Sequence, residues 1–420
     1  MPAFATLVSE PALLLADSAI VGHLGTTQLA GLGIAGNLLG ILTGLSVFLA
    51  YGTTGTVARR LGAGDRRGAL SGGVDGMVLA LGLGILLCLV LQLLMPEVIG
   101  WYDAGPEVAA AAEAYLRIAA CGLPSVLVLL ASTGVLRGLQ DTRTPLYVAI
   151  GCNLVNIGLN FTFVYGLDLG IAGAALGSLI AQTAAAGFLG TVVLRGARRH
   201  GAAIRFRPAG VITAARAGGW LILRTATLQI SITVTTVTAT SLGAVALAAH
   251  QVANSLWSLL AFALDAIAIA AQAVIGRYLG AGDVPMARRL TRRMIGWGVV
   301  AGIAFGAAVS LTSPLYVPLF TPDPEVQALL GQVLLVFAAI TPVAGIAFVL
   351  DGVLIGAGDG RYLALAGLIS MLAYLPLVWI VYRSEAGLVW LWAAYGGWIL
   401  ARTITLLVRA RSDAWMRTGA

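Results

Sequence analysis

The chain has 420 residues, of which 59% are apolar and only 10% are charged. Soluble domains carry roughly 25% charged residues, so these values exclude a water-exposed globular protein and predict a polytopic membrane protein. The net charge of +7 comes from arginine alone, since the sequence contains no lysine, and it indicates membrane topology rather than nucleic-acid binding.

Breaks at glycine, proline and charged clusters divide the sequence into apolar segments long enough to cross a bilayer. We therefore expect an all-α protein with about twelve transmembrane helices, whose partner is the lipid bilayer. In chain order, the predicted spans cover residues 2–23, 30–57, 72–95, 108–136, 145–166, 171–195, 216–241, 246–275, 290–317, 326–356, 361–382 and 387–409.

The loops between these spans fall into two alternating sets that differ in charge. One set includes "RRLGAGDRRG", "RGARRHGAAIRFRP" and the C-terminal tail, and 21 of the 25 arginines lie in or beside it. The positive-inside rule places this set, together with both chain termini, in the cytoplasm. We expect a multi-pass protein of the plasma or inner membrane.

A sequence repeat with a constant offset runs through the chain. The stretch "LGAGD" occurs at Leu61–Asp65 and again at Leu279–Asp283, and the same offset maps Gly134–Leu136 onto Gly352–Leu354. Because both copies of the loop are predicted to be cytoplasmic, the halves are expected to be parallel six-helix repeats, as in transporters that rock one lobe against the other. The predicted domains are an N-terminal lobe (1–199), a basic cytoplasmic linker (200–215) and a C-terminal lobe (216–420).

The first lobe has a candidate proton-coupling site around Asp17 in the opening helix. A charge inside a span is costly unless it faces a cavity or a partner. Asn156 and Asn160 lie one helical turn apart at a similar depth. A carboxyl beside amides in a low-dielectric cavity is predicted to take up and release a proton; the alternative is a permanently protonated packing group. Glu10, directly before Pro11, either lines the same cavity or caps a local helix break.

The second lobe carries three charged residues inside its predicted spans, namely Arg224, Asp265 and Asp351. At 1.5 Å per residue, all three lie on the order of 10–18 Å from the cytoplasmic boundary. A lone buried guanidinium is unfavourable, so we expect Arg224 to pair with Asp351, Asp265 or both. Such a pair would either fix helix packing or take part in ion coupling.

The sequence contains no pattern that is typical of an enzyme or a metal protein. Histidine and cysteine are not spaced as metal ligands, and a Walker-type loop cannot exist without lysine. We therefore expect no catalytic residues, no metal site, no cofactor and no nucleic-acid partner.

Six stretches, in this order along the chain, resemble the multidrug and toxic compound extrusion (MATE) family, and in particular its DinF-like branch. They are "SEPALLLADSAIVGHLG" (Ser9–Gly25), "VLRGLQDTRTPL" (Val135–Leu146), "NIGLNFTFVYG" (Asn156–Gly166), "LRTATLQIS" (Leu223–Ser231), "AAHQVANSLWSLLAFALDAIAIAAQAVIG" (Ala248–Gly276) and "LDGVLIGAGD" (Leu350–Asp359). The resemblance implies a V-shaped transporter with two six-helix lobes. It also implies export of cationic or amphipathic compounds in exchange for H⁺ or Na⁺.

The resemblance further implies roles for individual residues. Asp17 resembles the ion-coupling residue of such proteins, with Asn156 and Asn160 beside it. Pro2 matches a proline that is proposed to let the first helix bend when the aspartate is protonated. Some relatives have a second carboxylate at the position of Asn160, and sodium-coupled relatives have a glutamate in the helix that here carries Arg224.

These two departures favour H⁺ over Na⁺, because hard cations need several oxygen ligands and a single charge satisfies them poorly. Coupling to Na⁺ stays open. A flippase for lipid or lipid-linked oligosaccharide also stays open, although it predicts more cationic residues around the cavity. A membrane enzyme or scaffold is the remaining alternative. We expect a monomer that binds small molecules.

Overall fold

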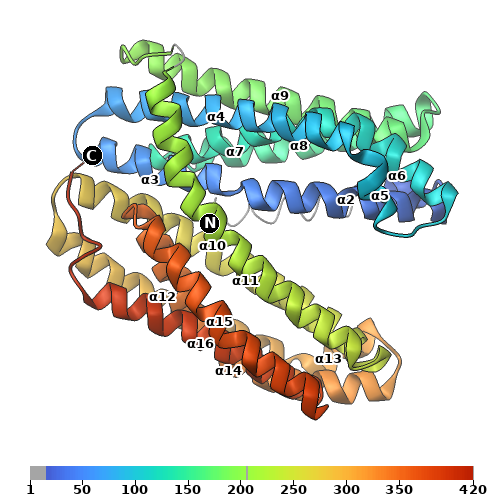
Figure 1. The fold of residues 1–420 in the computed structure, drawn as a ribbon. Helices are drawn as coiled ribbons and strands as arrows, with labels where there is room; N and C mark the ends of the chain where they lie inside the picture. Colours follow the sequence, from blue (N-terminus) through green and yellow to red (C-terminus); the bar gives the residue numbers. More distant parts are fainter. Residues whose placement is uncertain (1–15, 205–206, 420) are drawn as a thin grey trace. The chain divides into compact units, whose positions relative to one another are not determined.

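The computed structural model describes residues 16–204 and 207–419, and most of these residues are helical (Figure 1). Eleven helical segments within the described ranges are long and apolar enough to cross a membrane. The predicted first span lies mostly outside these ranges, and its described end is helical at residues 16–22. The chain divides into two compact units, Met1–Gly218 and Gly219–Ala420, each of which is described by itself.

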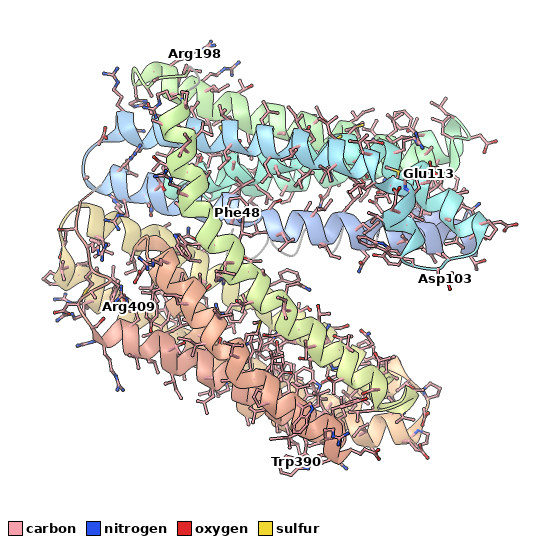
Figure 2. The ribbon with its side chains drawn as sticks, in the orientation of Figure 1. Phe48, Asp103, Glu113, Arg198, Trp390 and Arg409 are labelled. Carbon is pink, nitrogen blue, oxygen red and sulfur yellow. The ribbon has the colours of Figure 1, made fainter. Side chains whose placement is uncertain are left out.

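In the first unit, α4, α7, α8 and α9 lie side by side, with contacts between α4 and α7, α7 and α9, and α8 and α9 (Figure 1). Arg198 lies at one end of this unit, whereas Asp103 and Glu113 lie at the other (Figure 2). The basic and acidic ends agree with the sorting of the loops by charge. The helices are α2 (Thr26–Ser46), α3 (Phe48–Gly62), α4 (Arg66–Leu93), α5 (Met95–Gly100), α6 (Pro106–Ala119), η1 (Ala120–Gly122), α7 (Leu123–Gly138), α8 (Arg143–Phe161), η2 (Thr162–Gly166) and α9 (Gly170–Arg199).

The second unit is built around α14, which packs against α11, α12 and α16. Its core contains a cluster of aromatic rings, in which Trp257 makes edge contacts with Phe337 at 5.8 Å and Tyr395 at 5.1 Å between ring centres. The helices are α10 (Pro208–Ser241), which begins in the first unit, α11 (Ala244–Gly280), α12 (Val284–Leu311), α13 (Ser313–Phe320), α14 (Pro324–Gly356), α15 (Gly360–Ser384) and α16 (Leu388–Arg411).

The predicted spans after the first each coincide with one of the eleven apolar helical segments, although several of their ends differ by four residues or more. Two of these differences are explained by proline. Helix α10 begins at Pro208 instead of residue 216, because proline suits the first turn of a helix, so part of the predicted linker is helical. The predicted span 290–317 is divided, since α12 ends at Leu311 and α13 begins at Ser313. Pro314 has no N–H with which to continue the hydrogen-bond ladder.

The repeated "LGAGD" loop forms the same turn in both units. Gly64 and Gly282 each have a φ of +79°, a left-handed conformation that favours glycine. The next residue caps the following helix: Asp65 accepts a hydrogen bond from the Gly68 amide at 2.7 Å, and Asp283 accepts one from the Met286 amide at 3.0 Å. The loop therefore ends one helix and begins the next within a few residues.

The repeated glycines lie where two helices make close contact. A Cβ at Gly134 would lie 2.4 Å from the carbonyl oxygen of Ala50, and a Cβ at Gly352 would lie 2.2 Å from that of Ala268. Ala50 and Ala268 are themselves related by the offset of the repeat. Small residues at these positions let α7 pack on α3, and α14 on α11, as is common between membrane helices.

Candidate substrate and ion site

Asp17 lines a cavity of about 560 Å³ within the first unit. This volume is in the range of small-molecule sites, which is roughly 300–1,000 Å³. Leucine, glycine and other apolar residues make up most of the walls. The polar lining residues are Asp17, Ser18, Thr43, Tyr115, Ser178 and Gln182.

The structure brings the predicted amide pair to the Asp17 carboxyl group. Asn160 Nδ2 donates to Asp17 Oδ1 at 2.7 Å, and both asparagines are fully buried. In the orientation that gives both ends of its amide a partner, Asn156 also donates to Asp17 Oδ1, at 3.0 Å, and accepts from Ser178 Oγ at 2.8 Å. Amide N–H donors therefore surround one oxygen of this carboxyl group.

Two further polar residues of this network escaped the sequence analysis. The Ser178 hydroxyl on α9 interacts with both the Asp17 carboxyl and the Tyr115 hydroxyl on α6. Gly177 makes room for the network, since a Cβ there would lie 2.0 Å from Asn160 Oδ1. Single serines and tyrosines in apolar helices carry no periodic signal, so only the packing of α6 and α9 reveals them.

Asp17 has no arginine partner among the residues that the structure describes. The ion pairs found in the first unit join Arg117 to Glu113 and Arg207 to Asp75. The Arg117 side chain is 65% exposed and pairs with Glu113 one helical turn away. A buried carboxylate without a cation is unfavourable, so this group needs either a proton or a cationic ligand.

Three glycines of α2 keep the cavity wide. Gly33, Gly36 and Gly40 follow one another at helical spacing and line the cavity. A Cβ at each of them would meet no atom within 4 Å, so they border open space. The remaining predicted residues of this lobe, Glu10, Pro2 and Pro11, lie outside the described residues, and their roles stay predictions.

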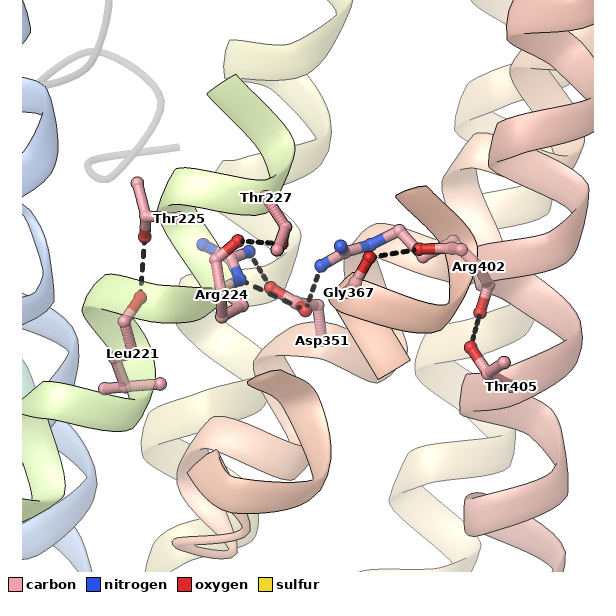
Figure 3. Close-up of polar contacts among 9 residues, drawn as sticks. Leu221, Arg224, Thr225, Thr227, Asp351, Gly367, Arg402 and Thr405 are labelled. Carbon is pink, nitrogen blue, oxygen red and sulfur yellow. Dashed lines mark hydrogen bonds and ion pairs between the residues drawn. The ribbon is translucent and has the colours of Figure 1, made fainter. Parts of the chain in front are cut away.

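In the second unit, a buried carboxylate joins two arginines from different helices (Figure 3). Arg224 on α10 pairs with Asp351 on α14, and Arg402 on α16 donates to Asp351 Oδ1 at 2.5 Å. The side chains of Arg224, Asp351 and Arg402 are 12%, 6% and 7% exposed. We call these three residues the Arg–Asp–Arg triad. It connects three helices through one carboxylate.

The structure therefore brings Arg224 and Asp351 together and adds Arg402, which the sequence analysis missed. The sequence did point to Arg402, because a charged residue well inside a predicted span, here 387–409, needs a partner or a cavity. Asp265 is partly buried on α11, and its expected contact with Arg224 stays a prediction. Within the described parts of the chain, no group of three or more His, Cys, Asp or Glu side chains is arranged to hold a metal ion.

Comparisons with known proteins give the family. The sequence profile of the MatE family matches residues 2–162 and 221–380. The chain belongs to the MATE family. It is 31% identical to Protein DETOXIFICATION 44, chloroplastic, of Arabidopsis thaliana over 396 residues, which cover 89% of this chain and 74% of that protein. It is also 27% identical to DNA damage-inducible protein F of Escherichia coli over 99% of this chain and 90% of that protein.

Solved structures share the fold of this MATE protein. The Vibrio cholerae MATE transporter VcmN in the bent form gives a TM-score of 0.89 at 23% sequence identity, with coverage of 99% of this chain and 96% of that chain. An outward-facing multidrug resistance MATE family transporter gives a TM-score of 0.86 at 21% identity, with coverage of 99% and 95%. The predicted fold class, an all-α polytopic membrane protein of the MATE type, is thus confirmed, and the protein is a multi-pass membrane transporter.

Proposed function

We propose that this MATE protein exports cationic or amphipathic organic compounds in exchange for protons. The observation that carries the proposal is the Asp17 carboxyl group, which lines a cavity of about 560 Å³ and accepts hydrogen bonds from buried amides without an arginine partner among the described residues. A relative in Thermotoga maritima, 23% identical, is named "Probable multidrug resistance protein NorM", and this name supports drug-like substrates here.

The coupling follows from competition for one negative charge. In surroundings of low polarity, the ionised form of Asp17 is stable only with a cation nearby. A cationic substrate in the cavity supplies that charge, and a proton on the carboxyl removes the need for it. Substrate and proton therefore exclude each other at Asp17, as an antiporter requires.

The proposed cycle has three steps. With Asp17 ionised, the cavity binds the substrate. A proton that enters from outside neutralises the carboxyl, and the substrate leaves to the exterior. After the two lobes reorient, the proton leaves to the cytoplasm. Bending of the first helix at Pro2 and Pro11 is part of this proposal, as are the cytoplasmic location of both termini, the cell membrane as the site of action and a monomeric state.

The site favours H⁺ over Na⁺ as the coupling ion. Na⁺ is bound by several oxygen atoms, but the Asn160 and Asn156 amides present nitrogen donors to Asp17 Oδ1 at 2.7 and 3.0 Å. These donors occupy the directions that oxygen ligands would need. Asn160 lies at the position where some relatives have a second carboxylate, so in this chain the amide pair adds no negative charge to the site.

The cavity lining argues against the flippase alternative. A flippase for phosphate-bearing lipids needs cationic side chains to hold the phosphate groups. Among the residues that the structure places around this cavity, none is basic, whereas Asp17 is acidic. Anionic substrates would therefore be repelled.

For the Arg–Asp–Arg triad we propose a structural role. The guanidinium groups of Arg402, which is buried, and Arg224, which is partly buried, share one carboxylate, and this arrangement holds α10, α14 and α16 together. Removing the central charge would take away the carboxylate that both arginines share. The triad thus stabilises the second unit, while the proton site lies in the first.

Transport by reconstituted liposomes tests the proposed function. A proton gradient imposed without a sodium gradient should drive accumulation of a fluorescent organic cation, and a sodium gradient alone should not. Asp17→Asn should abolish this accumulation. Asp103→Asn is the matched control, since Asp103 is exposed in a turn and its positive φ also suits asparagine. Normal transport by Asp17→Asn, or transport driven by sodium alone, would contradict the proposal.

A further inference from the structure

The exposed face of α12 changes from basic to apolar along the helix. Its first turns carry four exposed arginines, and the later turns expose apolar side chains. Arg293 stacks on Trp297, with its guanidinium carbon 5.2 Å from the ring centre. Tryptophan and arginine side chains concentrate at membrane–water interfaces, so this pair marks the level of the lipid head groups. The residues of this face are Arg288, Arg289, Arg292, Arg293, Trp297, Val300 and Ile303.

A pocket of about 470 Å³ lies at this basic end. It is lined by Val284 and Pro285 together with the arginine group Arg288, Arg289 and Arg292. Among the described residues, the ion pair of this group is between Arg288 and Asp413 at 2.6 Å, with side chains 47% and 80% exposed. Exposed ion pairs of this kind contribute little and are easily displaced. The pocket therefore concentrates positive charge around an open space.

The sequence repeat shows that the fold does not require arginine here. The offset of the repeat maps the four arginines onto positions of α4 that are all buried: Leu70, Ser71, Val74 and Asp75. In the first unit, Ser71 and Asp75 at these positions bind the chain segment that follows α9. The Ser71 hydroxyl accepts a hydrogen bond from the Ala203 amide at 3.0 Å, and Asp75 pairs with Arg207. The same helix face thus packs in one unit and is exposed and basic in the other.

We propose that this arginine pocket of α12 binds the phosphate group of an anionic phospholipid. Guanidinium groups match phosphate oxygens geometrically, with two parallel hydrogen bonds from one side chain. Clusters of basic residues next to a membrane span bind anionic lipid head groups. Trp297, Val300 and Ile303 continue the same exposed face, so the acyl chains of the bound lipid can lie along them while its phosphate stays in the pocket.

Native mass spectrometry of the purified full-length protein tests the proposal, with cardiolipin, phosphatidylglycerol or phosphatidylcholine added to it. The wild type should retain the two anionic lipids in preference to phosphatidylcholine. Each basic residue contributes about 1 kcal/mol to the free energy of binding an anionic lipid. Removing one arginine should therefore weaken binding roughly fivefold. The double variant Arg289→Gln/Arg292→Gln should therefore bind the anionic lipids roughly 25-fold more weakly.

The double variant Arg66→Gln/Arg67→Gln is the matched control. It changes the net charge equally, and both arginines are exposed at the start of α4, the equivalent helix of the first unit. It should keep wild-type lipid binding. Equal losses in the two double variants would show a general charge effect and overturn the proposal. Inorganic phosphate forms a separate arm: if it displaces cardiolipin at low millimolar concentration, the pocket is a free-phosphate site and the lipid assignment is wrong.

Discussion

Replacing Asp351 with asparagine removes the one negative charge that the two arginines of the triad share. The side chain keeps its shape, so the change is electrostatic rather than steric. Arg224 and Arg402 are left in surroundings where their side chains are only 12% and 7% exposed. Breaking a buried ion pair from one side typically costs about 3–5 kcal/mol, because the remaining charge stays buried without compensation.

This cost should appear as a lower unfolding temperature of the purified protein, followed by tryptophan fluorescence in detergent. A change of 1 kcal/mol shifts the midpoint by roughly 2–4 °C for a unit of about 200 residues, so Asp351→Asn should unfold roughly 10 °C below the wild type. Asp413→Asn removes the carboxylate of an exposed ion pair and should shift the midpoint by no more than about 2 °C.

A triple variant separates charge from packing. With Arg224→Leu, Asp351→Leu and Arg402→Met together, none of the three buried charges remains, and the midpoint should return to within a few degrees of the wild type. If Asp351→Asn alone unfolds at the wild-type temperature, the structural role of the triad is refuted. If that stable variant also loses transport, the triad belongs to the coupling machinery.

Two further predictions concern the cavity of the first unit. Gly177→Ala places a Cβ 2.0 Å from Asn160 Oδ1 and should displace that amide from Asp17, reducing proton-driven transport at least tenfold; Gly187→Ala on the same helix meets no atom within 4 Å and should transport normally. A Cβ at Gly36 meets no atom within 4 Å, so Gly36→Leu directs its side chain into the cavity and should weaken the binding of bulky substrates. Gly82→Leu is its control, since a Cβ at Gly82 also meets no atom within 4 Å and Gly82 lies outside the cavity lining; equal binding by the two variants would contradict the cavity assignment.

The spans were predictable because apolar length and loop charge are local properties of the sequence. Asp17 and the asparagine pair were also predictable, since an isolated polar residue inside an apolar helix has few explanations and depth can be counted along the chain. The break between α12 and α13 could also be predicted from the repeat, which maps Pro314 onto Pro96. Each proline lies in the first turn of a short helix, α13 and α5.

The remaining contacts depend on which helices are neighbours. Ser178 interacts with Asp17 only because α9 packs closely enough for Gly177 to contact Asn160. Arg402 joins the triad only because α16 packs on α14. Helix neighbours are set by the close fit of small residues over long sequence separations, and a single sequence does not specify those pairs.

A count of the protons released when the purified protein binds an organic cation tests the exchange of charge at Asp17 most directly. Isothermal titration in two buffers with different ionisation enthalpies gives this number near neutral pH. We expect release of up to one proton per substrate from the wild type and none from Asp17→Asn. Substrate binding without proton release by the wild type at every pH, or equal release by the variant, would contradict the exchange of charge at Asp17.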